Sequence, residues 1–134
     1  MIRILYISEA SGTINLEQIN DIQKSSLKFN AMNNITGVLV YGGTLFLQLL
    51  EGPEEAVFRL YVKILDDKRH HSCQILCISS VDERMFPNWS MGFIEREPFE
   101  FQHILELRKH RHKPDQSKEF TDIMHEFIQL SKKT

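Results

Sequence analysis

Two apolar runs joined by a pair of glycines constrain the fold more than any other feature of the chain. Residues 35–41 and 44–51 both read as strands, and Gly42-Gly43 has the freedom at positive φ that suits a two-residue hairpin turn. In the second run, alternation puts Gln48 on the same face as Phe46. A dry, unpaired carboxamide there would cost on the order of 1–3 kcal/mol. Gln48 therefore predicts either a polar partner inside the core or a strand edge that opens to water.

The other elements alternate around this hairpin. In chain order we expect a strand at residues 1–8, a helix capped by Asn15 and ending near Asn33, the hairpin, a helix that starts after Gly52-Pro53, and strands at residues 73–82 and 89–95. This order of strand, helix, strand, strand, helix, strand, strand predicts an α+β fold of the ferredoxin-like type. We expect a mixed five-stranded sheet with both helices on one face.

The pattern changes beyond Pro98. Helical spacing of Phe101, Ile104 and Leu105 predicts one helix, and a basic stretch at residues 108–113 with Pro114 ends it. A second helix then carries an apolar stripe, formed by Phe120, Ile123, Met124, Phe127 and Ile128. The stripe must pack on the open face of the sheet or on a second copy of the chain. We therefore divide the chain into a domain at 1–95 and a C-terminal helical segment at 96–134.

Composition excludes several classes of protein. The 134 residues carry a net charge of −2 with scattered basic residues, which argues against a nucleic-acid-binding surface. The apolar runs are only strand-length, so we expect no membrane span and a cytoplasmic protein. Cys73 and Cys77 lie four apart in a predicted strand, about 13 Å from each other, which is beyond disulfide reach. Both thiols should therefore be reduced.

Motifs for metal binding or conventional catalysis are missing from the sequence. His70 and His71 are adjacent, while His110 and His112 would point to different faces of a helix, so we predict no metal site. No nucleophile elbow, phosphate-binding glycine loop or dinucleotide fingerprint occurs. The carboxylates at the ends of the second helix, Glu54, Glu55, Asp66 and Asp67, are interpreted as structural. We expect that the protein is not an enzyme.

Polar residues on predicted interior surfaces indicate a different kind of site. Two helices on one face of a sheet leave a slot between them, with Tyr6 and Gln48 on its floor. Its walls would be Ile22 and Ile64, while Ser26 and Asn30, each four residues further along the first helix, offer hydrogen bonds at one edge. Each residue alone could be ordinary core or a helix end. Together they predict a site for a planar heteroaromatic ring.

Five dispersed motifs resemble, in order, those of the BLUF family, the blue-light sensors that use FAD. The resemblance runs from about Ile2 to Phe93 and rests on Leu5-Tyr6-Ile7-Ser8, Asn30 with the run 34–39, Phe46 to Pro53, Asp67-Lys68-Arg69-His70, and Arg84 to Phe93. It implies that FAD is the cofactor. It also implies that light-driven electron and proton transfer from Tyr6 through Gln48 rearranges the hydrogen bonds of the flavin.

The resemblance assigns roles to further residues. Asn30 would hydrogen-bond the carbonyl and nitrogen edge of the ring, Ile22 and Ile64 would sandwich it, and Ser26, Arg69 and His70 would complete the pocket. Trp89 and Met91 correspond to the pair on the last strand that is associated with signal output, although the motif leaves open which of them faces the flavin. Phe29 stands where many relatives carry His or Asn, so we expect it to pack beside the flavin.

The predicted output is a conformation rather than a product. It would pass through the C-terminal helices, or through a change in a homodimer or higher homo-oligomer, to a separate downstream signalling protein. Two alternatives stay open on sequence alone. One is a ferredoxin-like oxygenase with an aromatic substrate, and the other is a BLUF-like interaction module that has lost its photochemistry.

Overall fold

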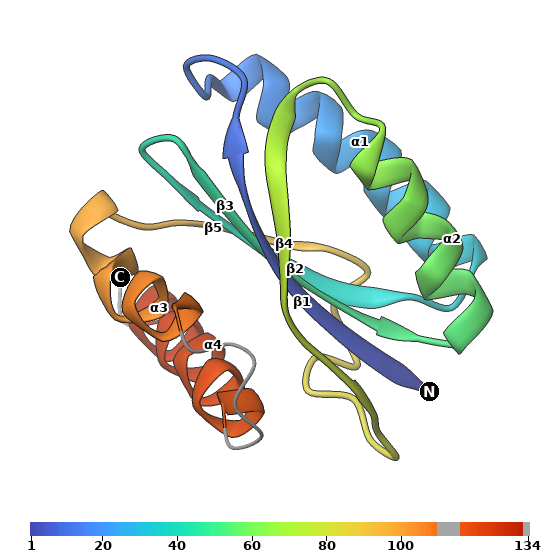
Figure 1. Cartoon of the computed structure of the whole chain (residues 1–134). Coiled ribbons are helices and arrows are strands. Elements are labelled where there is room, and N and C mark those ends of the chain that lie inside the picture. The colour runs from blue at the N-terminus through green and yellow to red at the C-terminus, as the bar shows by residue number, and fades with distance from the viewer. Residues whose placement is uncertain (110–115, 133–134) are drawn as a thin grey trace.

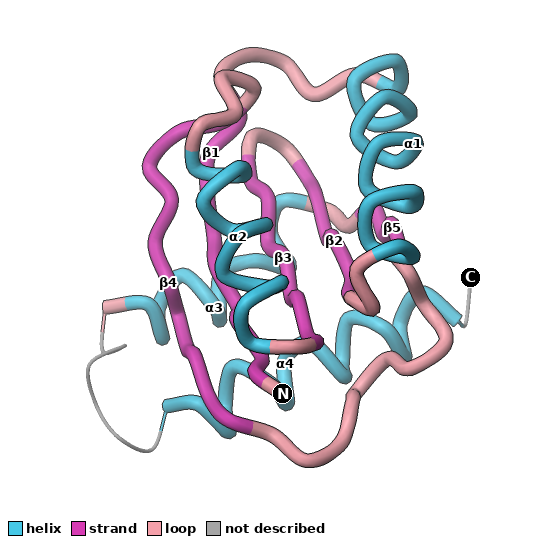
Figure 2. The backbone as a smooth tube through the Cα atoms, turned by 90° about the vertical axis from the view of Figure 1, so that its right-hand side faces the viewer, coloured by secondary structure: helices cyan, strands magenta, loops and turns pink. Residues whose placement is uncertain are grey.

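A five-stranded sheet with helices on both faces forms the molecule (Figure 1; Figure 2). This computed structural model describes residues 1–109 and 116–132. The elements are β1 (Ile2–Ala10), α1 (Leu16–Met32), β2 (Thr36–Gly42), β3 (Leu45–Gly52), α2 (Glu54–Leu65), β4 (His70–Ser80), β5 (Gly92–Glu95), η1 (Pro98–Phe101), α3 (Gln102–Arg108) and α4 (Gln116–Lys132). No helix in the described ranges is long and apolar enough to cross a membrane.

The sheet has the strand order β4-β1-β3-β2-β5. Neighbouring strands are antiparallel except β2 and β5, which are parallel. Figure 1 shows α1 and α2 together on one face of this sheet. The prediction of an α+β, ferredoxin-like fold with a mixed five-stranded sheet is therefore confirmed. The edge strand β4 is irregular, because its register against β1 shifts after Leu5 and again after Ile7.

Alternation along the strands sorts the core into two layers. Tyr6, Gln48 and Leu50 face α1 and α2, whereas Leu5 and Leu47, their neighbours along the chain, belong to the layer under α3 and α4. Because a shift of one residue would exchange the two faces, the register of β1 against β3 is set by burial on both sides. In this register Tyr6 lies directly opposite Gln48.

Local signals placed the first helix correctly. Asn15 caps α1, and its side chain accepts a hydrogen bond from the backbone N–H of Gln18 at 2.9 Å. Gln18 reaches back to the Asn15 backbone, which completes a capping box. The helix ends at Met32 with Asn33 as its C-cap, as predicted.

The hairpin turn is one residue later than predicted, at Gly43-Thr44. Gly43 has a φ of +56°, while Gly42 remains in β2 and pairs with Leu45. A Cβ on Gly42 would come within 2.0 Å of the Arg96 carbonyl oxygen. One glycine therefore supplies the positive φ of the turn, and the other makes room for the chain that follows β5.

The last two strands also differ from the predicted bounds. The strand predicted at 73–82 runs from His70 to Ser80, and the strand predicted at 89–95 begins only at Gly92. Trp89 and Met91 therefore precede β5 rather than lie in it. The cause is a fold-back of the chain, because a Cβ on Gly92 would come within 2.2 Å of the Trp89 ring.

The C-terminal helices cover the second face of their own sheet (Figure 1). Phe101, Ile104 and Met124 are fully buried there, and Ile123, Phe127 and Ile128 share the same core layer. Of the two surfaces considered for the apolar stripe, the structure thus shows the first: the stripe packs on the open face of the sheet. α3 ends at Arg108, but most of the predicted break at 108–113, Pro114 and the side chain of Phe120 lie outside the described residues.

Met124→Ala should destabilise the protein by about 2–5 kcal/mol, since it leaves a cavity where a buried side chain filled the layer between sheet and α4. Urea unfolding followed by circular dichroism measures the change. Glu126→Ala, an exposed position on the same helix, is the control and should stay within about 0.5 kcal/mol of the parent. Equal stability of the two variants would show that α4 is not anchored through its apolar stripe.

Candidate functional site

A cleft of about 240 Å³ opens between α1 and α2 above the sheet. Every pocket residue predicted from the sequence lines it: Tyr6, Ile22, Ser26, Phe29, Asn30, Gln48, Ile64, Arg69 and His70. Met91 joins them, whereas Trp89 does not. The predicted slot between the two helices therefore exists in the fold, with walls from both helices and a floor from β1 and β3.

The floor carries a buried pair of polar side chains. The Tyr6 hydroxyl donates a hydrogen bond to Gln48 Oε1, and the two residues are 3% and 5% exposed. Gln48 Nε2 points to Met91 Sδ at 3.5 Å, which is a weak acceptor. The polar partner that Gln48 required is thus Tyr6, its cross-strand neighbour. Burial is the main reason that the pKa of Tyr6 lies well above its ordinary value, so the phenol stays protonated.

Tyr6 also lies in an aromatic group at the bottom of the cleft. The ring of Tyr61 from α2 is tilted against it, with centroids 5.4 Å apart, and His70 is 6.4 Å away. Such tilted ring packing restricts the orientation of the phenol. The hydroxyl is thereby held toward Gln48 rather than toward solvent.

Asn30 presents an unsatisfied acceptor to the cleft. The residue is fully buried, and its Nδ2 donates to the Ser90 carbonyl at 2.7 Å. Its Oδ1 is buried and has no hydrogen-bond partner. A buried carbonyl oxygen without a partner carries a cost of about 1–3 kcal/mol, which a ligand N–H would remove. Asn30 is therefore the clearest candidate for a direct polar contact with a bound molecule.

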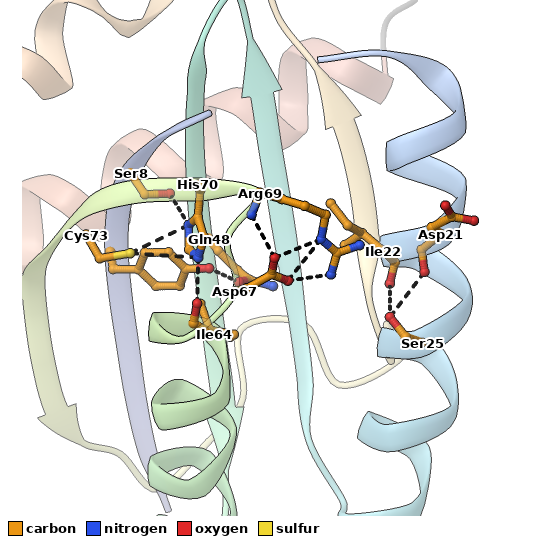
Figure 3. Close-up of polar contacts among 11 residues, drawn as sticks. Ser8, Asp21, Ile22, Ser25, Gln48, Ile64, Asp67, Arg69, His70 and Cys73 are labelled. Atoms are coloured by element: carbon orange, nitrogen blue, oxygen red, sulfur yellow. Dashed lines mark hydrogen bonds and ion pairs between the residues drawn. The ribbon is translucent and has the colours of Figure 1, made fainter. Parts of the chain in front are cut away.

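Arg69 does not act alone, because Asp67 holds it. The guanidinium Nε lies 2.9 Å from Asp67 Oδ1, and Nη2 pairs with Oδ2 (Figure 3). The hydrogen bonds from Arg69 lower the pKa of Asp67 below its ordinary value. The sequence interpretation of Asp67 as a purely structural helix-end residue was incomplete, since it lines the cleft with Arg69. Its place in the Asp67-Lys68-Arg69-His70 motif was the available signal.

His70 joins three elements at the end of the cleft. Its Nδ1 is 2.7 Å from Ser8 Oγ on β1, and its Nε2 is 2.6 Å from the carbonyl oxygen of Ile64 at the end of α2 (Figure 3). Cys73 Sγ lies 3.5 Å from Nδ1. With both ring nitrogens engaged, His70 holds the cleft together. Among the described residues no group of three metal-ligating side chains occurs.

The thiols are chemically quiet. Cys73 and Cys77 are free, as predicted. Burial raises the pKa of the Cys77 thiol to about 11 and also raises that of Cys73. A protonated thiol is a poor nucleophile and a poor metal ligand, so neither cysteine supplies chemistry at the cleft.

The wall residues include some that sequence reasoning missed. Lys63 extends over Phe29, with its Nζ 4.2 Å from the ring centroid, and both line the cleft. Other missed lining residues are Ser25, Leu39, Phe46 and Leu60. Phe46 was detectable because it shares the face of Gln48, and Leu60 because it belongs to the stripe of Ile64. Lys63 gave no sequence signal, since its position depends on how α1 and α2 pack.

The question left open between Trp89 and Met91 has a clear answer in this fold. Met91 is buried at the cleft beside Gln48. Trp89 lies in the opposite core layer, where its ring stacks on Phe86 at 5.8 Å with an interplanar angle of 21°. The two residues thus lie on different sides of the sheet, two positions apart in the chain.

The chain matches the family model BLUF, described as sensors of blue-light using FAD, over residues 1–92. Among curated proteins, the photoactivated adenylate cyclase subunit alpha of Euglena gracilis is 40% identical over 86 residues, which are 64% of this chain and 8% of that protein. The subunit beta of Euglena longa is 35% identical over 89 residues, which are 66% of this chain and 10% of that protein. The chain therefore spans about a tenth or less of these relatives.

Solved structures resemble the whole fold, including the C-terminal helices. A structure titled "BlrB - a BLUF protein, dark state structure" has a TM-score of 0.76 at 29% identity, covering 97% of this chain and 96% of that one. The ground state of BlsA has a TM-score of 0.74 at 32% identity, covering 90% and 85%. A bacterial light-regulated adenylyl cyclase has 0.70 at 41% identity, covering 91% of this chain and 36% of its own.

The raised pKa of Tyr6 predicts a loss of stability in alkali. Above the ordinary value of 10.0 the unfolded phenol ionises while the buried one keeps its proton, so the free energy of unfolding falls as pH rises toward the folded pKa. Tyr6→Phe removes the contribution of this phenol and should make the profile less steep between pH 9 and about 11, while the raised pKa values of Tyr61, Cys73 and Cys77 keep part of the slope. Unfolding midpoints measured across that range test the effect, and parallel profiles for the two proteins would contradict it.

Proposed function

Because the chain belongs to the BLUF family of blue-light sensors that use a flavin, we propose that it binds FAD in the cleft between α1 and α2 and signals light through Tyr6 and Gln48. The observation that carries the proposal is the buried hydrogen bond from the Tyr6 hydroxyl to Gln48 Oε1 on the cleft floor. A phenol can give up both an electron and a proton, and a carboxamide has a donor and an acceptor group.

The residues of the cleft fit a flavin ring. Ile22 from α1 and Ile64 from α2 both line the cleft and offer apolar surface to a ring, and the unsatisfied Asn30 Oδ1 can accept a hydrogen bond from a ring N–H. The Asp67–Arg69 pair and Lys63 supply polar groups on the α2 side, and Phe29 and Ser26 line α1. Ile22, Ser26, Phe29, Asn30, Gln48, Ile64, Arg69 and His70 are thus our proposed cofactor-binding residues.

The chemistry of the chain follows from this placement. When bound, an oxidised flavin absorbs blue light and becomes a strong electron acceptor. Tyr6 is the electron donor within the cleft floor, and its proton moves along the existing hydrogen bond to Gln48 Oε1. Gln48 would gain the phenolic proton at Oε1 and give one from Nε2 to a ring nitrogen of the bound flavin. Return of the electron and of a proton to Tyr6 would then leave the amide in a different orientation or tautomer.

The rearranged amide would persist because the pocket offers it two sets of partners. In the present arrangement Oε1 accepts from Tyr6, and Nε2 has only the weak Met91 sulfur. Turning the amide would bring a nitrogen donor toward the phenol and free an oxygen acceptor, which changes the contacts with both Tyr6 and Met91. In a buried site, the amide can pass from one arrangement to the other only by breaking hydrogen bonds that water does not replace. This favours two discrete states.

The output of the sensor would be a conformational signal, without substrate turnover in this chain. We propose that residues 1–95 form the flavin-binding domain and that residues 96–134 carry the response to a separate effector protein in the cytoplasm. The named relatives are photoactivated cyclases, in which the similar segment covers only a small part of the protein. We assign Trp89 and Met91 to signal output. We also propose that the protein self-associates as a homodimer or larger homo-oligomer.

Two alternatives to this proposal have less support. An oxygenase would need a reactive group for its second substrate, whereas the polar floor of the cleft is already closed by the Tyr6–Gln48 bond. A BLUF-like module without photochemistry would not require that buried bond, which costs desolvation of two polar groups. The bond therefore favours a photoactive sensor.

The visible spectrum of the purified protein tests the cofactor directly. We expect a yellow preparation whose main band moves to the red under blue light and returns in the dark. Release of the cofactor by denaturation and separation from FMN and riboflavin standards should identify FAD. A colourless protein that cannot be reconstituted with any of the three flavins would end the proposal.

Gln48→Leu should keep the flavin and abolish the red shift, because it retains side-chain volume and removes the amide that relays the proton. Tyr6→Phe should behave in the same way, since it keeps the ring and removes the transferable proton. Gln102→Leu, an exposed glutamine outside the cleft, is the control and should shift like the parent. A normal photocycle in Gln48→Leu, measured by absorbance after a blue flash, would remove the amide from the mechanism.

A further inference from the structure

The connection between β4 and β5, residues 81–91, has to cross the whole sheet. β4 and β5 are the two opposite edges, so the chain passes the ends of β1, β3 and β2 on its way (Figure 2). It carries Phe86, Trp89 and Met91. The way in which this connection is fastened decides what a change in the cleft can move.

Residues 89–91, the end of the connection next to β5, are bonded from the cleft side. The Ser90 carbonyl accepts from Asn30 Nδ2 at 2.7 Å, and the Met91 sulfur contacts Gln48 Nε2 at 3.5 Å. The Trp89 carbonyl accepts from the backbone N–H of Gly37 at 3.0 Å. Two of the three anchors are therefore side chains that line the cleft.

Residues 84–86, in the middle of the connection, are bonded by the buried carboxylate of Glu51, which lies on the opposite face of the sheet. Glu51 is fully buried, three positions after Gln48 on β3, and alternation puts it on the face under α4. Its Oε1 accepts from the backbone N–H of Phe86 at 2.7 Å, and its Oε2 accepts from Arg3 Nε at 3.1 Å. Arg84 adds bonds to the Glu51 carbonyl at 3.1 Å and to Thr36 Oγ1 at 2.8 Å.

Phe86 is also where the connection meets α4. Its ring stacks on Trp89, lies 6.1 Å from the His125 ring, and belongs to the core layer that contains Met124 and Phe127. The residue whose N–H is held by Glu51 is thus the residue that touches the C-terminal helix. The contact between Phe86 and α4 can transmit a shift only if the backbone at Phe86 stays in place.

We propose that Glu51 is a positioning residue of the light response: it holds Phe86 against α4, so that a change of Gln48 at Met91 moves the Phe86–Trp89 stack relative to that helix. A loosely held connection would absorb the same change within residues 81–91. The inference rests on the proposed light-sensing function. Glu51 itself makes no contact with the cleft, so flavin binding and the visible shift do not depend on it.

The test is hydrogen–deuterium exchange of α4 in the full-length, flavin-loaded protein, in the dark and under blue light. The wild-type protein should show a light-minus-dark difference in the amides around His125. Glu51→Leu removes both carboxylate acceptors, including the one that holds the Phe86 N–H, and Phe86→Leu removes the stack. Each should keep the visible red shift and lose at least half of the α4 difference.

Two matched variants separate transmission from general loss of structure. Phe86→Tyr keeps an aromatic ring and should preserve the α4 difference, although it also alters the core. Glu100→Gln weakens a similarly shielded pair, with Arg96 at 2.9 Å, outside the connection, and should behave like the wild type. All exchange is measured at a temperature where each variant is fully folded.

Each result decides one question. If the wild-type protein shows no visible shift, the proposed function fails. If it shifts while α4 exchange is the same in light and dark, or while Phe86→Leu retains the wild-type difference, the role of Glu51 and Phe86 is refuted. A Glu51→Leu variant that retains the wild-type difference refutes the role of Glu51. Should that variant not fold, the comparison of Phe86→Leu with Phe86→Tyr decides whether the Phe86 contact carries the signal to α4.

Discussion

The rest of the site depends on the hydrogen bond between Tyr6 and Gln48. It joins directly opposed residues on β1 and β3, and both residues are buried, with the Tyr61 ring against Tyr6 and the Met91 sulfur against the Gln48 amide. A polar pair in such a place must be satisfied internally, because water cannot replace a lost partner. Any reorientation of the amide therefore changes its contacts with Tyr6 and Met91. A sensor needs this property, whereas an ordinary core avoids it.

Features governed by local pattern were predictable from the sequence. Period-two alternation put Tyr6 and Gln48 on one face, and the capping residues of α1 and the proline before α2 set the helix starts. The slot followed, because two helices on one side of a sheet have to leave a space between them. The family resemblance, carried by five motifs in order, then indicated what such a slot holds.

What the sequence could not supply depends on contacts between distant segments. The pairing of Asp67 with Arg69 is short-range, but its position at the cleft depends on the turn after α2. Met91 and Trp89 are separated by the fold-back over Gly92, which an apolar run with aromatic residues does not reveal. The anchoring of residue 86 by Glu51 spans 35 positions and could not be read from either segment alone. Such long-range polar contacts give the cleft its connection to the other face of the sheet.

The irregular pairing of β4 has a consequence for how copies of the chain can meet. An edge strand with regular spacing offers its outer backbone groups to any similar strand, and sheets then grow from one molecule into the next. β4 breaks that spacing twice along its length, and Ser72 within it has a φ of 56°. Its rim is too uneven to serve as a template, so assembly by continuous strand addition is disfavoured on that side. The sheet can thus stay exposed at this border without inviting fibres.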